Sequence, residues 1–165
     1  MSAATTPAER AATSRVAGVA LALAVFAADQ ASKAWVLALD LSQGPLKVLP
    51  VLDITLVWNR GISYGLLQQD GTGRWLLVAF TVVATLLLAA WLWRAQSGLV
   101  RLAVGGIIGG ALGNLVDRTL YGAVVDFVHL HWRTFSWYVF NVADAAIVLG
   151  VVALLGDALL TRRAE

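Results

Sequence analysis

Four long runs of apolar residues dominate the pattern along the chain, at residues 16–39, 75–93, 99–120 and 139–160. Each run is rich in Leu, Ala and Val and carries polar residues at only a few positions. The hydrocarbon core of a bilayer is about 30 Å thick, so a helix needs about 20 apolar residues to cross it. The pattern therefore predicts four transmembrane helices, because too little polar sequence remains to cover four buried helices of a soluble domain.

Two longer segments separate these runs. In residues 40–74, β-branched side chains alternate imperfectly with others over residues 46–58, which favours short strands. Residues 61–67 are expected to form a short amphipathic helix at the membrane surface. Residues 121–138 are predicted to be a second loop on the same side of the membrane. The fold class is therefore an all-α membrane protein with a small external addition, and residues 1–165 form a single membrane domain.

Basic residues near the ends of the runs indicate the orientation, since loops on the cytoplasmic side retain Lys and Arg. They lie before the first run, between the second and third, and after the fourth: Arg10 and Arg15, Arg94 and Arg101, Arg162 and Arg163. The two remaining loops carry mixed charge. Both termini, including a tail of residues 1–15 predicted to be disordered, are therefore expected in the cytoplasm.

A cleavable secretory signal is an alternative interpretation of the N-terminus. Arg10 and Arg15 would be its basic region, and Ala27-Ala28 would supply small residues at a cleavage site. Against it, apolar sequence resumes after Lys33, and cleavage would leave only three spans. We therefore expect the first run to remain as a membrane helix.

Composition excludes several classes of protein. Charged residues make up 13% of the 165 residues, whereas soluble domains carry about 25%. The chain has no cysteine, which excludes a disulfide scaffold, a Cys-ligated metal centre and a thiol nucleophile. The net charge is +2, but the 12 basic residues are scattered singly, so no nucleic-acid-binding surface is predicted.

The third run repeats glycine at four-residue spacing, at Gly105, Gly109 and Gly113. Such a stripe presents a flat helix face, which a neighbouring helix can approach closely. Helix packing is the expected role of these glycines.

Several ionisable side chains lie inside the predicted helices, where each costs at least about 2.5 kcal/mol and so needs a partner or a function. Asp29 and Lys33 are four residues apart on the first helix, so they share a face and can form an ion pair. Asn114, Asp117 and Arg118 lie three and four residues apart near the outer end of the third helix. Structural roles suffice for both groups: an ion pair that also bonds a neighbouring helix, and anchoring at the membrane interface.

Asp126 and Asp144 have no adjacent cation in the sequence. Asp126 follows the third helix in an apolar stretch, and Asp144 is expected five residues into the fourth helix, with Asn141 one turn earlier on the same side. Two carboxylates in apolar surroundings are difficult to ionise together and tend to share one proton, as in an aspartic protease. The residues alone leave three interpretations open: a catalytic dyad, a proton or ion pathway, and structural polar contacts.

Five short blocks carry a family resemblance. They read DQASK at 29–33, NRGISYG at 59–65, GGALGNLVDR at 109–118, VVDF at 124–127 and FNVAD at 140–144. In this order and at these separations, the chain resembles the lipoprotein signal peptidases, or signal peptidase II, the intramembrane aspartic proteases of bacteria. The resemblance covers residues 29–144.

The resemblance implies roles for individual residues. The two catalytic aspartates of the family fall on Asp126 and Asp144. The supporting and substrate-binding shell falls on Asp29, Lys33, Asn59, Gly61, Asn114, Asp117, Arg118 and Asn141. The family also has a small external β-cradle and a surface helix, which the first loop can supply. Ser63 and Tyr64 differ from the small residue and Phe expected there, which bears on specificity and not on the chemistry.

The resemblance further implies the substrate and the setting. The family cuts diacylglyceryl-modified prolipoproteins just before the lipidated cysteine, in the bacterial cytoplasmic (inner) membrane. It needs no metal or organic cofactor, contacts membrane lipids, works as a monomer and is inhibited by globomycin. A secretory signal presents its cleavage site at the outer leaflet, which is also where the charge pattern places both aspartates.

Three other functions compete with this one. Asp126, His129 and His131 have a spacing that suits a zinc protease. Ser32 and Lys33 suggest a serine–lysine protease, with Ser63 as a second candidate nucleophile, although neighbours on a helix point about 100° apart. A proton-coupled transporter would be expected to carry polar residues near the midplane and internal repeats, and we find no repeat.

Overall fold

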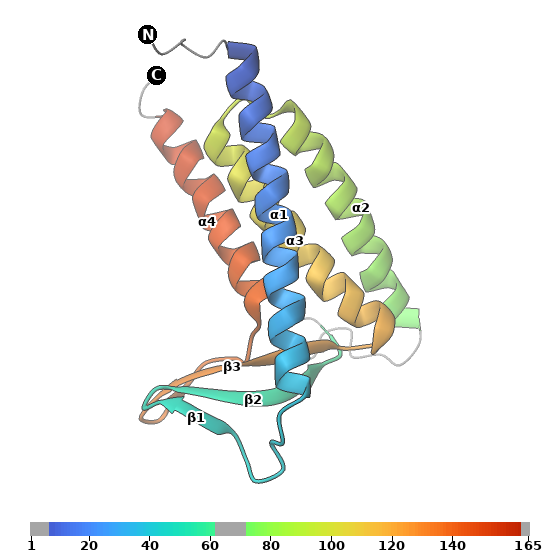
Figure 1. The fold of residues 1–165 in the computed structure, drawn as a ribbon, viewed down its shortest axis with the longest axis vertical. Coiled ribbons are helices and arrows are strands. Elements are labelled where there is room, and N and C mark those ends of the chain that lie inside the picture. The colour runs from blue at the N-terminus through green and yellow to red at the C-terminus, as the bar shows by residue number, and fades with distance from the viewer. Residues whose placement is uncertain (1–6, 62–71, 163–165) are drawn as a thin grey trace.

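The computed structural model describes residues 7–61 and 72–162. Within this part of the chain, four helices pack side by side: α1 (Pro7–Leu37), α2 (Thr72–Arg94), α3 (Gly98–Leu120) and α4 (Val142–Arg162). Each contains a stretch long and apolar enough to cross a membrane. A small antiparallel sheet lies across one end of the bundle, and the start of α1 and the end of α4 lie at the opposite end (Figure 1). The predicted fold class is confirmed.

The starts of α1 and α4 differ from the prediction. Residues 7–15 belong to α1, so the expectation of a disordered tail is wrong there. Proline at the first helical position favours a helix start, because its fixed φ suits the helix and its missing N–H has no helical partner to lose. Helix α4 begins at Val142 and not at residue 139, since the backbone of Phe140 pairs with Val128.

The sheet has the order β1-β2-β3-β4. Its strands are β1 (Leu46–Leu49), β2 (Leu52–Asn59), β3 (Val124–Trp132) and β4 (Phe135–Ser136). The first two confirm the strands expected within residues 46–58, whereas β3 and β4 arise in the segment predicted only as a loop. The surface helix expected from Gly61 onward lies, apart from Gly61 itself, outside the described residues.

Helix α3 is the centre of the bundle. In its apolar window 67% of the residues are buried, against 17% or less in the other three helices, whose outer faces are apolar and exposed. A Cβ at Gly105 or Gly109 would collide with the backbone of α1, and one at Gly110 would collide with the backbone of Ala143 in α4. The glycines therefore bring both neighbours against α3, which fixes where the polar side chains of three helices meet.

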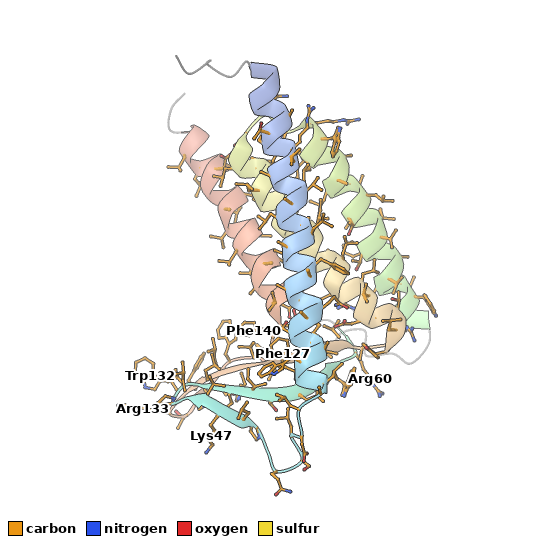
Figure 2. The ribbon with its side chains drawn as sticks, viewed as in Figure 1. Lys47, Arg60, Phe127, Trp132, Arg133 and Phe140 are labelled. Atoms are coloured by element: carbon orange, nitrogen blue, oxygen red, sulfur yellow. The ribbon has the colours of Figure 1, made fainter. Side chains whose placement is uncertain are left out.

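The sheet joins the bundle through an apolar cluster. Val36 of α1, Ile54 of β2 and Phe127 of β3 are its buried members. Figure 2 shows Phe127 and Phe140 where the sheet meets the helices, and Trp132 at the far tip of the sheet. This packing holds β2 and β3 against the end of α1 and against Val142, the first residue of α4.

Candidate active site

Asp126 lies near the start of β3 and is almost fully buried. Its position follows from the β2–β3 register, in which Val57 lies opposite Asp126 and Asn59 is two residues further on the same strand face. Asn59 Nδ2 donates to Asp126 Oδ2 at 3.0 Å, and Asn141 Nδ2 donates to Asp126 Oδ1 at 2.7 Å. Both oxygens of this carboxylate therefore have an amide donor.

Asp144 is the third residue of α4, so the expectation that it lies five residues into the helix is wrong. Asn141 precedes the helix, and its Oδ1 accepts a hydrogen bond from the Asp144 N–H at 2.9 Å. In return Asp144 Oδ2 accepts from the Asn141 N–H at 3.3 Å. These reciprocal bonds form a capping box. The other oxygen, Oδ1, accepts from Asn114 Nδ2 at 2.8 Å.

Asn141 brings the two aspartates together, since its side-chain amide binds Asp126 while its backbone N–H binds Asp144. Burial, and then the negative charge of Asp144, raise the pKa of Asp126 to about 7, although hydrogen bonds from Asn59 and Asn141 and the charge of Lys33 act in the opposite direction. The pair therefore combines two properties of an acid–base dyad: both carboxylates bind Asn141, and the pKa of one of them is close to neutral pH.

A buried ion cluster lies on the bundle side of this pair. Lys33 Nζ is 2.7 Å from Asp29 Oδ2 and 2.8 Å from Asp117 Oδ2, and it donates to Asn114 Oδ1 at 3.0 Å. Gln30 Nε2 donates to both carboxylates, at 3.2 Å each. The ion pair between Asp29 and Lys33 that the sequence indicated is thus present, and Asp117 completes it across to α3.

Gly61 and Arg118 complete the set of predicted residues. The Gly61 N–H donates to Asn59 Oδ1 at 3.1 Å, which leaves the Asn59 NH₂ group free to face Asp126. Arg118, half-buried near the end of α3, interacts electrostatically with Asp144, Asp126 and Asp117. The ten residues named from the sequence therefore gather at one place, where α1, α3, α4 and the sheet meet.

Comparison with known proteins identifies the family. The family model described as signal peptidase (SPase) II matches residues 21–160. The chain belongs to the signal peptidase II family. A lipoprotein signal peptidase of Methylorubrum extorquens (strain PA1) is 56% identical over 145 residues, which are 86% of this chain and 85% of that protein. One from Beijerinckia indica subsp. indica is 50% identical over 153 residues, 91% of this chain and 92% of that protein.

Solved structures share the fold. A bacterial membrane enzyme determined by the in meso method at 2.3 Å resolution superposes with a TM-score of 0.78 at 24% identity and covers 90% of each chain. A second, at 1.9 Å resolution, gives a TM-score of 0.77 at 25% identity over 86% of this chain and 92% of that one. The arrangement of four helices and a sheet is therefore a known membrane-enzyme fold.

The residues proposed for a zinc protease or a serine–lysine protease do not come together with the partners that those mechanisms need. His129 Nε2 lies 2.7 Å from Ser136 Oγ, and His131 Nε2 lies 3.1 Å from Asp53 Oδ2. Strand alternation puts both histidines on the face of β3 opposite Asp126, and no three His, Asp or Glu side chains among the described residues are grouped to hold a metal ion. The Ser32 hydroxyl donates to Asp29 O of its own helix, and Lys33 binds other groups; Ser63 and Tyr64 lie outside the described residues.

Sequence reasoning missed three contributors to the site: the Gln30 amide and the backbone N–H groups of Val125 and Ala143. Val125 N donates to Asp117 Oδ2 at 3.0 Å, and Ala143 N donates to Asp29 Oδ1 at 2.9 Å. Backbone donors have no sequence signal of their own. The Asn-x-x-Asp spacing of residues 141–144 does carry one, since it is the spacing of a capping box.

Proposed function

We propose that this protein is an intramembrane aspartic endopeptidase that removes the signal peptide from diacylglyceryl-modified prolipoproteins and cuts before the lipidated cysteine. The relatives are lipoprotein signal peptidases, which supports the substrate class. The observation that carries the mechanism is the bridge through Asn141, which joins the carboxylates of Asp126 and Asp144 within one buried polar network. The reaction needs no metal or organic cofactor.

In the proposed reaction the two carboxyls divide acid and base chemistry between them. We assign the shared proton to Asp126, whose pKa is raised to about 7, and the role of base to Asp144. Asp144 takes a proton from water as the water oxygen attacks the scissile carbonyl carbon, and Asp126 donates its proton to the carbonyl oxygen. As the tetrahedral intermediate collapses, the C–N bond breaks, the amine leaves with the proton that Asp144 took up, and Asp126 recovers a proton from a hydroxyl of the intermediate as the carbonyl re-forms.

The membrane setting of this proposal follows from the bundle. Asp144 lies in the first turn of α4, at the end of the bundle that carries the sheet, so a peptide bond reaches the dyad without crossing the bilayer centre. The acyl chains of the substrate stay among membrane lipids, beside the exposed apolar faces of the helices. We expect a monomer in the bacterial cytoplasmic membrane, with both termini in the cytoplasm, the dyad at the outer leaflet, and inhibition by globomycin.

The decisive test replaces each aspartate by its uncharged isostere. Asp126→Asn and Asp144→Asn, made separately, should each abolish cleavage of a lipidated precursor by the purified protein in phospholipid vesicles, because neither amide can exchange the proton. Asp53→Asn is the matched control, since Asp53 is a buried carboxylate of the same sheet that pairs with His131 and not with the dyad. Cleavage at the wild-type rate by either dyad variant would refute the mechanism.

A further inference from the structure

The cluster of Asp29, Lys33 and Asp117 contains more than an ion pair. All three residues are almost completely buried, with exposed fractions of 0% for Asp29, 2% for Lys33 and 1% for Asp117. Lys33 has three N–H donors, and all three have acceptors in Asp29, Asp117 and Asn114. Charges this deeply buried need a complete set of partners, and the cluster obtains two of them from the backbone.

Those two backbone partners occupy equivalent positions in the chain. Asp117 accepts from the N–H of Val125 at 3.0 Å, and Asp29 accepts from the N–H of Ala143 at 2.9 Å. Val125 directly precedes Asp126, and Ala143 directly precedes Asp144. Each buried carboxylate therefore holds the peptide unit next to one member of the dyad.

We propose that Asp29, Lys33 and Asp117 form a positioning clamp, in which each carboxylate fixes the backbone beside one catalytic aspartate and Lys33 binds the two halves together. This inference rests on the proposed function. The clamp connects α1 and α3 to the two elements that carry the dyad, β3 and α4, which are otherwise separate segments of the chain. Without it, the separation of the two carboxyl groups would depend on the side-chain amides of Asn114 and Asn141.

The Ala143 contact also explains why the clamp needs an acid at residue 29. The first four N–H groups of a helix have no acceptor within the helix, and the N-terminus carries partial positive charge. Ala143 is the second residue of α4. The Asp29 carboxylate satisfies one of these N–H groups, so it stabilises the turn from which Asp144 projects.

Lys33 has a second effect, on the side-chain amides. Because Lys33 donates to Asn114 Oδ1, the NH₂ group of Asn114 must face Asp144. Asn114 Oδ1 also accepts from Asn141 Nδ2 at 3.1 Å, which turns that NH₂ group toward Asp126. The charge of Lys33 thus orients both amides so that each presents a donor to one carboxylate of the dyad.

A role in substrate binding is the alternative for these three residues, and kinetics separates the two. A clamp affects only the geometry of the reacting groups, so its loss lowers kcat and leaves KM unchanged, whereas loss of a substrate contact raises KM. Asp117→Leu removes the acceptor for Val125 and leaves Lys33 paired with Asp29. Asp117→Asn keeps an oxygen that can accept the same hydrogen bond.

We expect Asp117→Leu to lower kcat by about 100-fold with KM within about twofold of wild type, because a displacement of about 1 Å has that effect. Asp117→Asn should recover most of this loss and remain within about tenfold of wild type, since one neutral hydrogen bond replaces a charged one.

The controls are Asp40→Leu and Asp40→Asn, the same changes at an exposed loop carboxylate, which should leave both constants unchanged. If Asp117→Leu is not recovered folded, Asp117→Ala is measured by the same criteria. Equal activity of the Leu and Asn variants, or a rise in KM alone, would overturn the clamp.

Gly113→Ala tests the other half of the clamp without changing any charge. A Cβ at Gly113 would overlap Oδ2 of Asp29, the oxygen that pairs with Lys33, so the alanine moves the whole carboxylate away from both Lys33 and the Ala143 N–H. We expect a loss in kcat of tenfold or more, about 1.4 kcal/mol, with KM unchanged. Wild-type kcat in this variant would contradict the role of Asp29.

The outcomes distinguish the clamp from the function on which it rests. If Asp126→Asn or Asp144→Asn retains activity, the aspartic mechanism fails whatever residue 117 does. If both are inactive while Asp117→Leu, Asp117→Asn and Gly113→Ala all behave like wild type, the mechanism stands and the clamp fails.

Discussion

At the scale of single residues, the site depends on how each oxygen of the dyad is hydrogen-bonded. Asp126 has one amide on each oxygen, and both donors favour its ionised form. Burial and the charge of Asp144 outweigh them and raise its pKa to about 7. The singly protonated dyad therefore persists up to about this pH and is lost as the pH rises further.

This balance gives a pH prediction. We expect kcat/KM to fall on the alkaline side with an apparent pKa of about 7, that of Asp126. Asn59→Leu removes a hydrogen bond that stabilises the carboxylate, so it should raise the pKa of Asp126 and move this limb to higher pH. The measurement is a rate profile from about pH 5 to about pH 9 in phospholipid vesicles.

The control for that profile is Gln96→Leu, which removes an exposed amide in the loop between α2 and α3. It should leave the alkaline limb in place. A shift to lower pH in Asn59→Leu would contradict the assignment of the limb to Asp126.

Much of this residue-scale information was available from the sequence, since the polar side chains within apolar runs are costly and therefore few. The ion pair of Asp29 with Lys33 followed from helix spacing alone. The partners of Asp117 did not, because Gln30 and the Val125 N–H reach it only through contacts between elements. The depth of Asp144 was misjudged because Val139 and Phe140 are apolar and hide the start of the helix at Val142.

At the scale of elements, close packing around α3 decides where the polar groups meet. Gly105 lies against the backbone of Gly18 in α1, where no side-chain rotation can make room for a larger residue. A Cβ at Gly156 of α4, in contrast, would meet no other atom within 4 Å. The two glycines therefore form a matched pair for testing the packing.

We expect Gly105→Val to lower the free energy of unfolding by about 3 kcal/mol, near the upper end for overpacked sites, or to prevent folding. Gly156→Val should have little effect on stability. Thermal unfolding of both variants in detergent provides the comparison. Equal midpoints for the two variants would contradict the close approach of α1 and α3.

The pattern of apolar and polar residues along the chain predicted the helices well and the sheet only in part. Each apolar run gave a helix, since the length needed to cross a bilayer is a strong constraint on residues that are close in sequence. Strand β3 was missed because its pairing with β2 joins residues more than 60 positions apart, such as Val57 and Asp126. Such pairing depends on the helices that bring the two segments together, and no short window of sequence contains it.

At the scale of the whole molecule, the fold has two chemically different ends. The sheet and the candidate active site lie at one end, and the start of α1, the end of α4 and the short loop between α2 and α3 lie at the other (Figure 1). Arg94 and Arg101 flank that loop, as expected for the cytoplasmic side. Because the helices fix the two ends relative to each other, an experiment that shows on which side of the membrane one loop lies also shows the side of the candidate active site.

The chain is suited to such a test because it has no cysteine, so a single introduced thiol has no background. Lys47→Cys places the thiol on β1, where Lys47 points away from the bundle (Figure 2). Gln96→Cys places it in the loop between α2 and α3, and both positions are exposed. We expect a membrane-impermeant maleimide to label residue 47 in intact spheroplasts and residue 96 only after permeabilisation.

The reverse pattern would put the dyad on the cytoplasmic side and remove its access to a secreted precursor. Labelling of both positions after permeabilisation serves as the control for thiol accessibility, and the unmodified chain should give no signal. If residue 47 alone reacts in intact spheroplasts, the sheet lies on the outer side of the membrane. The loop that contains residue 96 then lies on the cytoplasmic side, because the two are at opposite ends of the helix bundle. The carboxylates beneath that sheet then face the leaflet at which an exported signal peptide ends its hydrophobic segment.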